Sequence, residues 1–277
     1  MFEEIIGHEE QIKMLKKALE VKNISHAYLF TGSKGIGKCK IAFEFARGIL
    51  NVKTLSSSPD FKYICKSEDK RDIVIEQIRK EIIDDVYIAP AASEKKVYII
   101  DEAESLNIAA QNALLKTLEE PPKHVVIILI AQNVNSFLNT ILSRVNTITF
   151  NNIPKNEFKK YVQENLKASL SDNILEFLNG SLGLAINLIK ENKLDELKEI
   201  DSLYNSLLSK DEINSFLNSS KINFNNSLNL EYLEYLLYSS GKYFCVKFVE
   251  KARNRLKSNG NYDIVIDNMI LKIVEHI

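Results

Sequence analysis

The chain has 277 residues, is 45% hydrophobic and 26% charged, and carries a net charge of −1. This composition is typical of one large folded domain or two to three smaller ones, and the charge excludes a chain-wide basic surface for nucleic acid. Three scattered cysteines without a CxxC pair, Cys39, Cys65 and Cys245, argue against a disulfide framework or a zinc site and favour a cytoplasmic location. We expect no secretion signal and no membrane span.

Apolar residues three and four apart predict a helix over residues 8–21, followed by a strand over residues 27–31 and a helix from about residue 38. Between the strand and the second helix, Gly32, Gly37 and Lys38 fit the phosphate-loop pattern G-x-x-x-x-G-K-[ST]. Glycines let backbone N–H groups turn toward phosphate oxygens, and the lysine reaches the β- and γ-phosphates. The pattern predicts a site for ATP or ADP lined by Gly32, Ser33, Lys34, Gly35, Gly37, Lys38 and Cys39. The alternative is a glycine-rich turn that binds nothing.

Cys39 departs from this pattern, which has serine or threonine in its place. A hydroxyl there coordinates Mg²⁺, whereas a thiol is a poor ligand for a hard cation that prefers oxygen. We therefore expect a loop that holds a nucleotide without hydrolysing it well. The alternative is that Cys39 is simply a small residue that packs.

A further amphipathic helix is predicted over residues 71–88, and the apolar run over residues 97–100 predicts a strand buried on both faces of a parallel sheet. Asp101 and Glu102 follow this strand, at the edge where ligands of such sheets bind. Asp101 is expected to hold Mg²⁺ through water, and Glu102 to orient or deprotonate an attacking water. The alternative is an acidic cap on the next helix.

A helix over residues 107–120 ends at two prolines, and the next apolar strand ends at Gln132. Gln132 is expected to sense a γ-phosphate or else to cap its strand. Ser143 and Arg144 precede a short strand at residues 147–150. The alternation of strands and helices over residues 27–150 predicts an α/β fold with a doubly wound parallel sheet.

After Pro154 the pattern contains helices and no strands. Three short helices are predicted over residues 156–193, further helices from residue 197 onward, and a loop over residues 218–229. The basic run at residues 247–257 is expected to be a solvated helix face, with contact to nucleic acid as the alternative.

Four segments carry a family resemblance: residues 5–19, 26–38, 97–122 and 140–145. In them the chain resembles the bacterial clamp-loader branch of the AAA+ ATPases, most of all the delta-prime subunits of DNA polymerase III. The resemblance implies a AAA+ nucleotide-binding domain over residues 1–152, a three-helix lid over residues 153–196, and a helical collar over residues 197–277 that binds other subunits.

The resemblance also implies a function and partners. Such a subunit helps the ATP-driven loading of a sliding clamp onto primed DNA, within a five-membered ring that includes gamma/tau-like and delta-like subunits. Arg144 is then expected to act as an arginine finger on a neighbour's γ-phosphate, with a local ion pair as the alternative. The competing interpretation is a self-sufficient motor ATPase of the gamma/tau type.

Two departures from the family pattern bear on these expectations. The four-cysteine zinc module that is common in the family is reduced here to Cys65 alone, so no zinc is expected. At the place of a nucleotide-sensing lid arginine the chain has Gly183 and Leu184, which argues against the motor interpretation.

Overall fold

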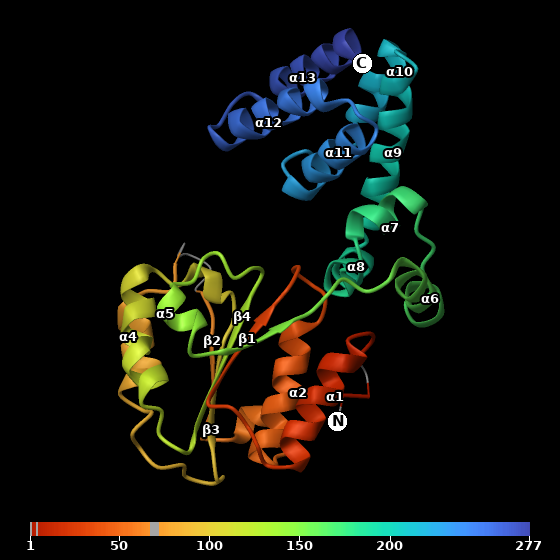
Figure 1. The fold of residues 1–277 in the computed structure, drawn as a ribbon. Helices are drawn as coiled ribbons and strands as arrows, with labels where there is room; N and C mark the ends of the chain where they lie inside the picture. Colours follow the sequence, from red (N-terminus) through yellow and green to blue (C-terminus); the bar gives the residue numbers. More distant parts are fainter. Residues whose placement is uncertain (1, 4, 67–71) are drawn as a thin grey trace. The chain divides into compact units, whose positions relative to one another are not determined.

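A computed structural model describes residues 2–3, 5–66 and 72–277, and Figure 1 shows the fold. The chain divides into two compact units. The first comprises Met1–Phe158 with Gly180–Gly183, and the second comprises Lys159–Asn179 with Leu184–Ile277. The three-part division at residues 152 and 196 stays a prediction.

The first unit is built on a five-stranded parallel sheet. Its strands follow the order β2-β3-β4-β1-β5, and every neighbouring pair is parallel. The strands are β1 (Ala27–Thr31), β2 (Phe61–Ile64), β3 (Lys96–Ile100), β4 (Val125–Ala131) and β5 (Asn146–Thr149). All residues of β1, β3 and β4 are buried, as a sheet covered on both faces requires. The predicted doubly wound α/β fold is confirmed.

Helices cover both faces of this sheet (Figure 1). One face packs against α1 and α2, and the other packs against α3, α4 and α5, so that two separate apolar cores form. These helices are α1 (Glu9–Glu20), α2 (Lys38–Leu50), α3 (Ile75–Ile78), α4 (Ile108–Glu119) and α5 (Asn139–Leu142). Single turns at Leu55–Ser57, Arg79–Ile83 and Ala103–Ser105 complete the unit.

The helix predicted over residues 71–88 is wrong at both ends, and residue 71 lies outside the described residues. Ile73 instead forms a parallel bridge with Leu106, so its backbone is extended. The helix begins at Ile75, passes into a π-helical turn and ends at Ile83. Asp85, just beyond it, pairs with the Lys96 side chain at 3.1 Å. Contacts with distant residues therefore override the local apolar periodicity.

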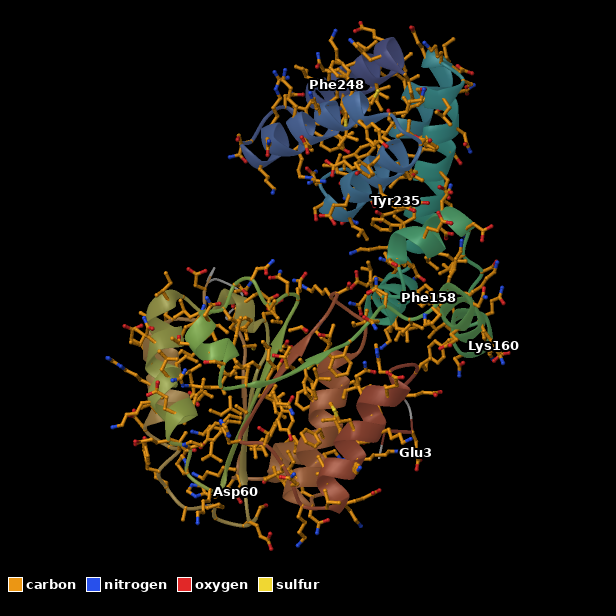
Figure 2. All side chains as sticks on the ribbon, viewed as in Figure 1. Glu3, Asp60, Phe158, Lys160, Tyr235 and Phe248 are labelled. Atoms are coloured by element: carbon orange, nitrogen blue, oxygen red, sulfur yellow. The ribbon has the colours of Figure 1, made fainter. Side chains whose placement is uncertain are left out.

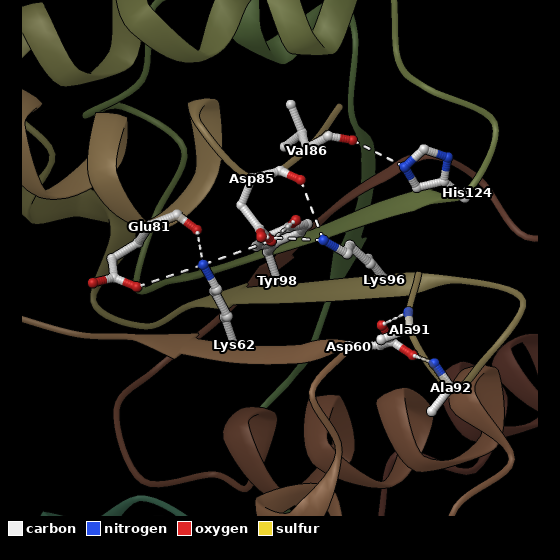
Figure 3. Close-up of polar contacts among 10 residues, drawn as sticks. All are labelled: Asp60, Lys62, Glu81, Asp85, Val86, Ala91, Ala92, Lys96, Tyr98 and His124. Carbon is white, nitrogen blue, oxygen red and sulfur yellow. Dashed lines mark hydrogen bonds and ion pairs between the residues drawn. The ribbon is translucent and has the colours of Figure 1, made fainter. Parts of the chain in front are cut away.

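A polar network ties β2 and β3 together at the amino-terminal edge of the sheet (Figure 3). Asp85 accepts a hydrogen bond from the Tyr98 hydroxyl at 2.6 Å and pairs with Lys96, whose side chain is 6% exposed. Lys62 lies 3.6 Å from the same carboxylate. His124 contacts the Val86 carbonyl oxygen at 2.9 Å. These contacts fix the strands whose opposite ends carry Tyr63 and Asp101.

Asp60 anchors the same edge (Figures 2 and 3). Its side chain is 2% exposed and accepts hydrogen bonds from the backbone N–H groups of Ala91, Ala92 and Ser93, at 2.6, 2.8 and 2.7 Å. Burial alone would raise the pKa of Asp60, but these three donors and Lys96 hold that pKa below its usual range. The carboxylate thus satisfies backbone donors that would otherwise be buried without partners.

The region after residue 154 is helical, as predicted. Its helices are α6 (Lys155–Asn165), α7 (Asp172–Leu178), α8 (Leu182–Lys190), α9 (Leu194–Leu208), α10 (Glu212–Ser219), α11 (Ser227–Ser239), α12 (Tyr243–Lys257) and α13 (Tyr262–His276). Among the described residues, no helix is both long and apolar enough to cross a membrane.

The loop predicted over residues 218–229 is shorter in the structure. Helix α10 continues to Ser219, and α11 begins at Ser227 because the Asn226 side chain caps the Leu228 N–H at 3.3 Å. On α11, the fully buried Tyr232 donates a hydrogen bond to Asp201 at 2.7 Å and packs against Phe177 of α7. This aromatic face of α11 belongs to the core of the second unit.

Candidate functional site

The predicted phosphate loop connects the end of β1 to the start of α2. Gly37 has φ 104°, in a region that side chains with a Cβ rarely adopt, and it immediately precedes the first helical residue. In the described part of the chain, the backbone N–H groups of residues 33–37 meet no acceptor. A loop with free amides in front of a helix N-terminus is suited to anions.

Lys38 lies beneath this loop. Its side chain is buried, and its ammonium donates to the carbonyl oxygens of Gly32 at 2.6 Å and Ser33 at 2.7 Å. Burial lowers the pKa of Lys38, while the nearby carboxylates of Glu104 and Asp101 act in the opposite direction. The cation is therefore held where phosphate oxygens above the loop can compete for it.

Asp101 follows β3 and has both carboxylate oxygens engaged. Oδ2 accepts a hydrogen bond from the Tyr63 hydroxyl at 2.8 Å, and Oδ1 accepts one from the Glu102 N–H at 2.9 Å. Burial, followed by the charge of Asp101, raises the pKa of the Cys39 thiol to about 12. The thiol is therefore protonated at neutral pH.

Glu102 is held by two lysines at the mouth of the site. Its side chain lies 3.3 Å from Lys34 in the loop and 3.4 Å from Lys66 after β2. Burial acts to raise the pKa of Glu102, but the two lysines outweigh burial, so the pKa of Glu102 lies below its usual range. The residue has φ 48°, a left-handed conformation that is strained for a side chain with a Cβ.

The remaining predicted residues lie apart from these contacts. Gln132 is exposed, and its backbone carbonyl accepts the Gly32 N–H at 3.3 Å. Arg144 follows α5, where it pairs with Glu119 of α4 at 2.9 Å and donates to the Thr140 carbonyl at 2.7 Å. The local ion pair that the sequence left open is thus present.

The start of α8 contacts the loop through backbone alone. The N–H of Gly183 donates to the Gly35 carbonyl at 2.8 Å, and both residues belong to the first unit. A Cβ at position 183 would lie 3.1 Å from the Gly35 Cα, closer than most such contacts. Glycine is therefore needed here, and no side chain from this position reaches the site.

Sequence reasoning missed Tyr63 and Lys66. Tyr63 lies on β2 opposite Ile99 of β3, so the parallel register carries it to the same carboxyl edge as Asp101. The ring packs against Phe43 of α2, with centroids 5.2 Å apart. A register assignment for the short β2 strand was the missing signal.

Comparison with known protein families identifies the family of this chain. A family model described as "DNA polymerase III, delta subunit" matches residues 7–154, which is more than half of the chain. The chain belongs to the DNA polymerase III clamp-loader family.

Relatives and a crystal structure agree with this assignment. The chain is 32% identical over 209 residues to a gamma subunit from Buchnera aphidicola, covering 68% of this chain and 57% of that protein. It is 39% identical over 165 residues to the tau subunit of Bacillus subtilis, covering 55% of this chain and 29% of that protein. The chain thus spans less than two thirds of the length of these clamp-loader relatives.

A crystal structure of a gamma subunit-related protein from Thermotoga maritima shares the fold. It covers 95% of this chain and 99% of its own length, with a TM-score of 0.62 at 21% identity. The parallel sheet covered by helices and the helix-rich region after it are the fold that the sequence predicted.

Proposed function

We propose that this chain is a clamp-loader subunit of the delta-prime type, which helps to load a sliding clamp onto primed DNA. In this role it joins gamma/tau-like and delta-like subunits in a five-membered ring in the cytoplasm. The observation that carries the proposal is the contact of Gly183 with Gly35. At the place where the resemblance puts the nucleotide-sensing arginine of motor subunits, this chain has Gly183, which has no side chain, followed by Leu184.

The nucleotide site supports the same role. Gly32, Ser33, Lys34, Gly35, Gly37 and Lys38 supply amides and a cation for the phosphates of ATP or ADP. Cys39 replaces the hydroxyl that motor subunits need. Glu102 has a strained backbone conformation and is ion-paired with Lys34 and Lys66. We therefore propose that this subunit binds nucleotide and contributes little turnover of its own.

Arg144 is proposed to serve a neighbouring subunit. Its side chain is 33% exposed, and its partner Glu119 is 49% exposed, so the ion pair lies in contact with solvent. Exposed pairs contribute roughly 0–1 kcal/mol, which an incoming phosphate can outcompete. The guanidinium fork can thus exchange Glu119 for a γ-phosphate.

The names of the relatives favour a second candidate. Both the Buchnera and the Bacillus proteins are gamma or tau subunits, which makes a self-sufficient motor ATPase the alternative function. The two functions differ in what the chain does by itself.

Co-assembly and turnover separate these functions. The chain is produced with gamma/tau-like and delta-like subunits and passed over a gel-filtration column, and its own ATP hydrolysis is then measured. We expect a stable complex and negligible turnover by the isolated chain. Failure to assemble would refute the clamp-loader role, and turnover abolished by Glu102→Gln would establish the motor function instead.

A further inference from the structure

The donor set around Asp101 does not suit magnesium. Mg²⁺ requires near-octahedral oxygen ligands at about 2.0–2.1 Å and usually retains several waters. Cys39 stands where the phosphate-loop pattern has serine or threonine, and its thiol is a soft donor. Asp101, the carboxylate expected to hold the metal through water, already accepts hydrogen bonds at both oxygens, from the Tyr63 hydroxyl and the Glu102 N–H.

The Tyr63 hydroxyl donates a hydrogen bond to one of the two oxygens with which Asp101 would hold a metal-bound water. A water on Mg²⁺ and a phenol both donate an O–H to a carboxylate, and Tyr63 does so at 2.8 Å. The ring packs against Phe43, which belongs to the helix that follows the phosphate loop. Tyr63 is 42% exposed, so this ring contact and the bond to Asp101 set its position.

Three lysines supply the positive charge that a metal would otherwise bring. Lys38 lies under the loop, while Lys34 and Lys66 meet at Glu102. The Lys34 side chain is 77% exposed, so its ion pair with Glu102 is weak and easily exchanged. Ammonium groups that converge on one carboxylate at the mouth of a phosphate loop can bind a diphosphate directly.

We propose that this loop binds ADP or ATP in its metal-free form, because Cys39 lacks the hydroxyl that would ligate magnesium and Asp101 is hydrogen-bonded to Tyr63. The inference rests on the nucleotide binding of the proposed function and names the form of the ligand. Lys34, Lys38 and Lys66 neutralise the phosphates.

Titration calorimetry of the full chain with ADP, in EDTA or in magnesium chloride, tests this inference. Magnesium is expected to leave the affinity unchanged or to weaken it, because the metal removes free ADP from solution. The double variant Cys39→Thr/Tyr63→Phe restores an oxygen ligand and frees Asp101. In that variant, magnesium is expected to tighten ADP binding about fivefold or more, a difference of about 1 kcal/mol.

A matched control removes a phenol elsewhere in the first unit. Tyr87→Phe changes an exposed residue and should bind ADP as the unaltered chain does, with and without the metal. If the double variant does not fold, the single variant Tyr63→Phe replaces it in the test. It should bind Mn²⁺ in the presence of ADP, detected by electron paramagnetic resonance, more tightly than the unaltered chain.

Three results would overturn the inference. They are tighter ADP binding by the unaltered chain in magnesium, a folded double variant that stays insensitive to magnesium, and no ADP binding under either condition. Gel filtration of the same preparation with its partner subunits separates this failure from that of the proposed function. A chain that assembles but binds ADP only with magnesium, or not at all, remains a clamp-loader subunit.

Discussion

The two edges of the parallel sheet carry similar residues in different surroundings, one in a buried polar network and the other at the candidate nucleotide site. At the amino-terminal edge, Asp60 is 2% exposed and accepts three backbone N–H groups, and Asp85 is surrounded by Lys62, Lys96 and Tyr98. At the carboxyl edge, Glu102 is strained and shared between two partly exposed lysines. Each edge thus contains a carboxylate with several donors, but Asp60 is almost completely buried whereas the side chain of Glu102 is 37% exposed.

The difference shows what distinguishes a structural network from a binding site. Removing a partner from a buried network leaves uncompensated polar groups, whose desolvation reduces stability. Removing a partner at the open edge leaves groups that water can reach, so stability changes little and binding changes instead. Variants at the two edges should therefore separate the unfolding free energy from nucleotide affinity.

The largest effect is expected from Asp60→Ala. It leaves the N–H groups of Ala91, Ala92 and Ser93 without their acceptor and should lower the unfolding free energy by about 3 kcal/mol. Urea denaturation followed by circular dichroism measures the change. Asp84→Ala, an exposed aspartate nearby, is the control and should change stability by less than about 0.5 kcal/mol. Equal losses in the two variants would contradict the structural role of Asp60.

Lys38→Ala should reduce nucleotide affinity more than it reduces the unfolding free energy. The charge-assisted contacts with phosphate are lost, so nucleotide affinity should fall by about 1.5–3 kcal/mol. The unfolding free energy should change less than in Asp60→Ala, because the ammonium of Lys38 contacts only loop carbonyls among the described residues. Calorimetry with ADP and urea denaturation give both values. Unchanged affinity at millimolar nucleotide would leave the loop a glycine-rich turn.

A smaller effect is expected from pH. The pKa values of Asp60 and Asp85 are lowered in the folded chain, although burial alone would raise both. Their contribution to stability is complete above the ordinary aspartate pKa of about 4 and is lost as pH falls through the lower folded values. Urea denaturation between pH 6 and pH 3 should show this loss, and Asp85→Asn should reduce its slope. If Asp85→Asn leaves the pH dependence of the unfolding free energy unchanged, Asp85 does not cause the loss of stability in acid.

Much of the fold could be predicted from the sequence because its signals are local. The apolar runs at β3 and β4 predict strands buried on both faces, and α4 ends at Glu119, just before Pro121. The helix predicted over residues 71–88 failed because Ile73 pairs with Leu106, a contact that periodicity does not encode. The phosphate loop was found by its spacing, whereas Tyr63 reaches Asp101 only through the pairing of β2 with β3. Contacts between residues on neighbouring strands could not be predicted, because the sequence does not show which strands pair or in which register.

The contrast between the edges also bears on Arg144, which lies outside both networks and in contact with solvent. Arg144→Ala should leave folding, ring assembly and nucleotide binding by this chain intact, because only the exposed pair with Glu119 is lost. Glu119→Gln is the matched control, since it breaks the same pair and keeps the guanidinium. Arg144→Lys should not restore the full rate of the assembled complex, because a point charge lacks the planar fork.

The most direct test of this account is the steady-state ATPase rate of the reconstituted complex in the presence of clamp and primed DNA. With assembly verified by gel filtration, Arg144→Ala should lower the rate by about twofold or more, because one interface of the ring loses its guanidinium. Glu119→Gln should leave the rate at or above that of the unaltered complex. An undiminished rate in a fully assembled Arg144→Ala complex would contradict the account and leave Arg144 as a partner of Glu119 alone.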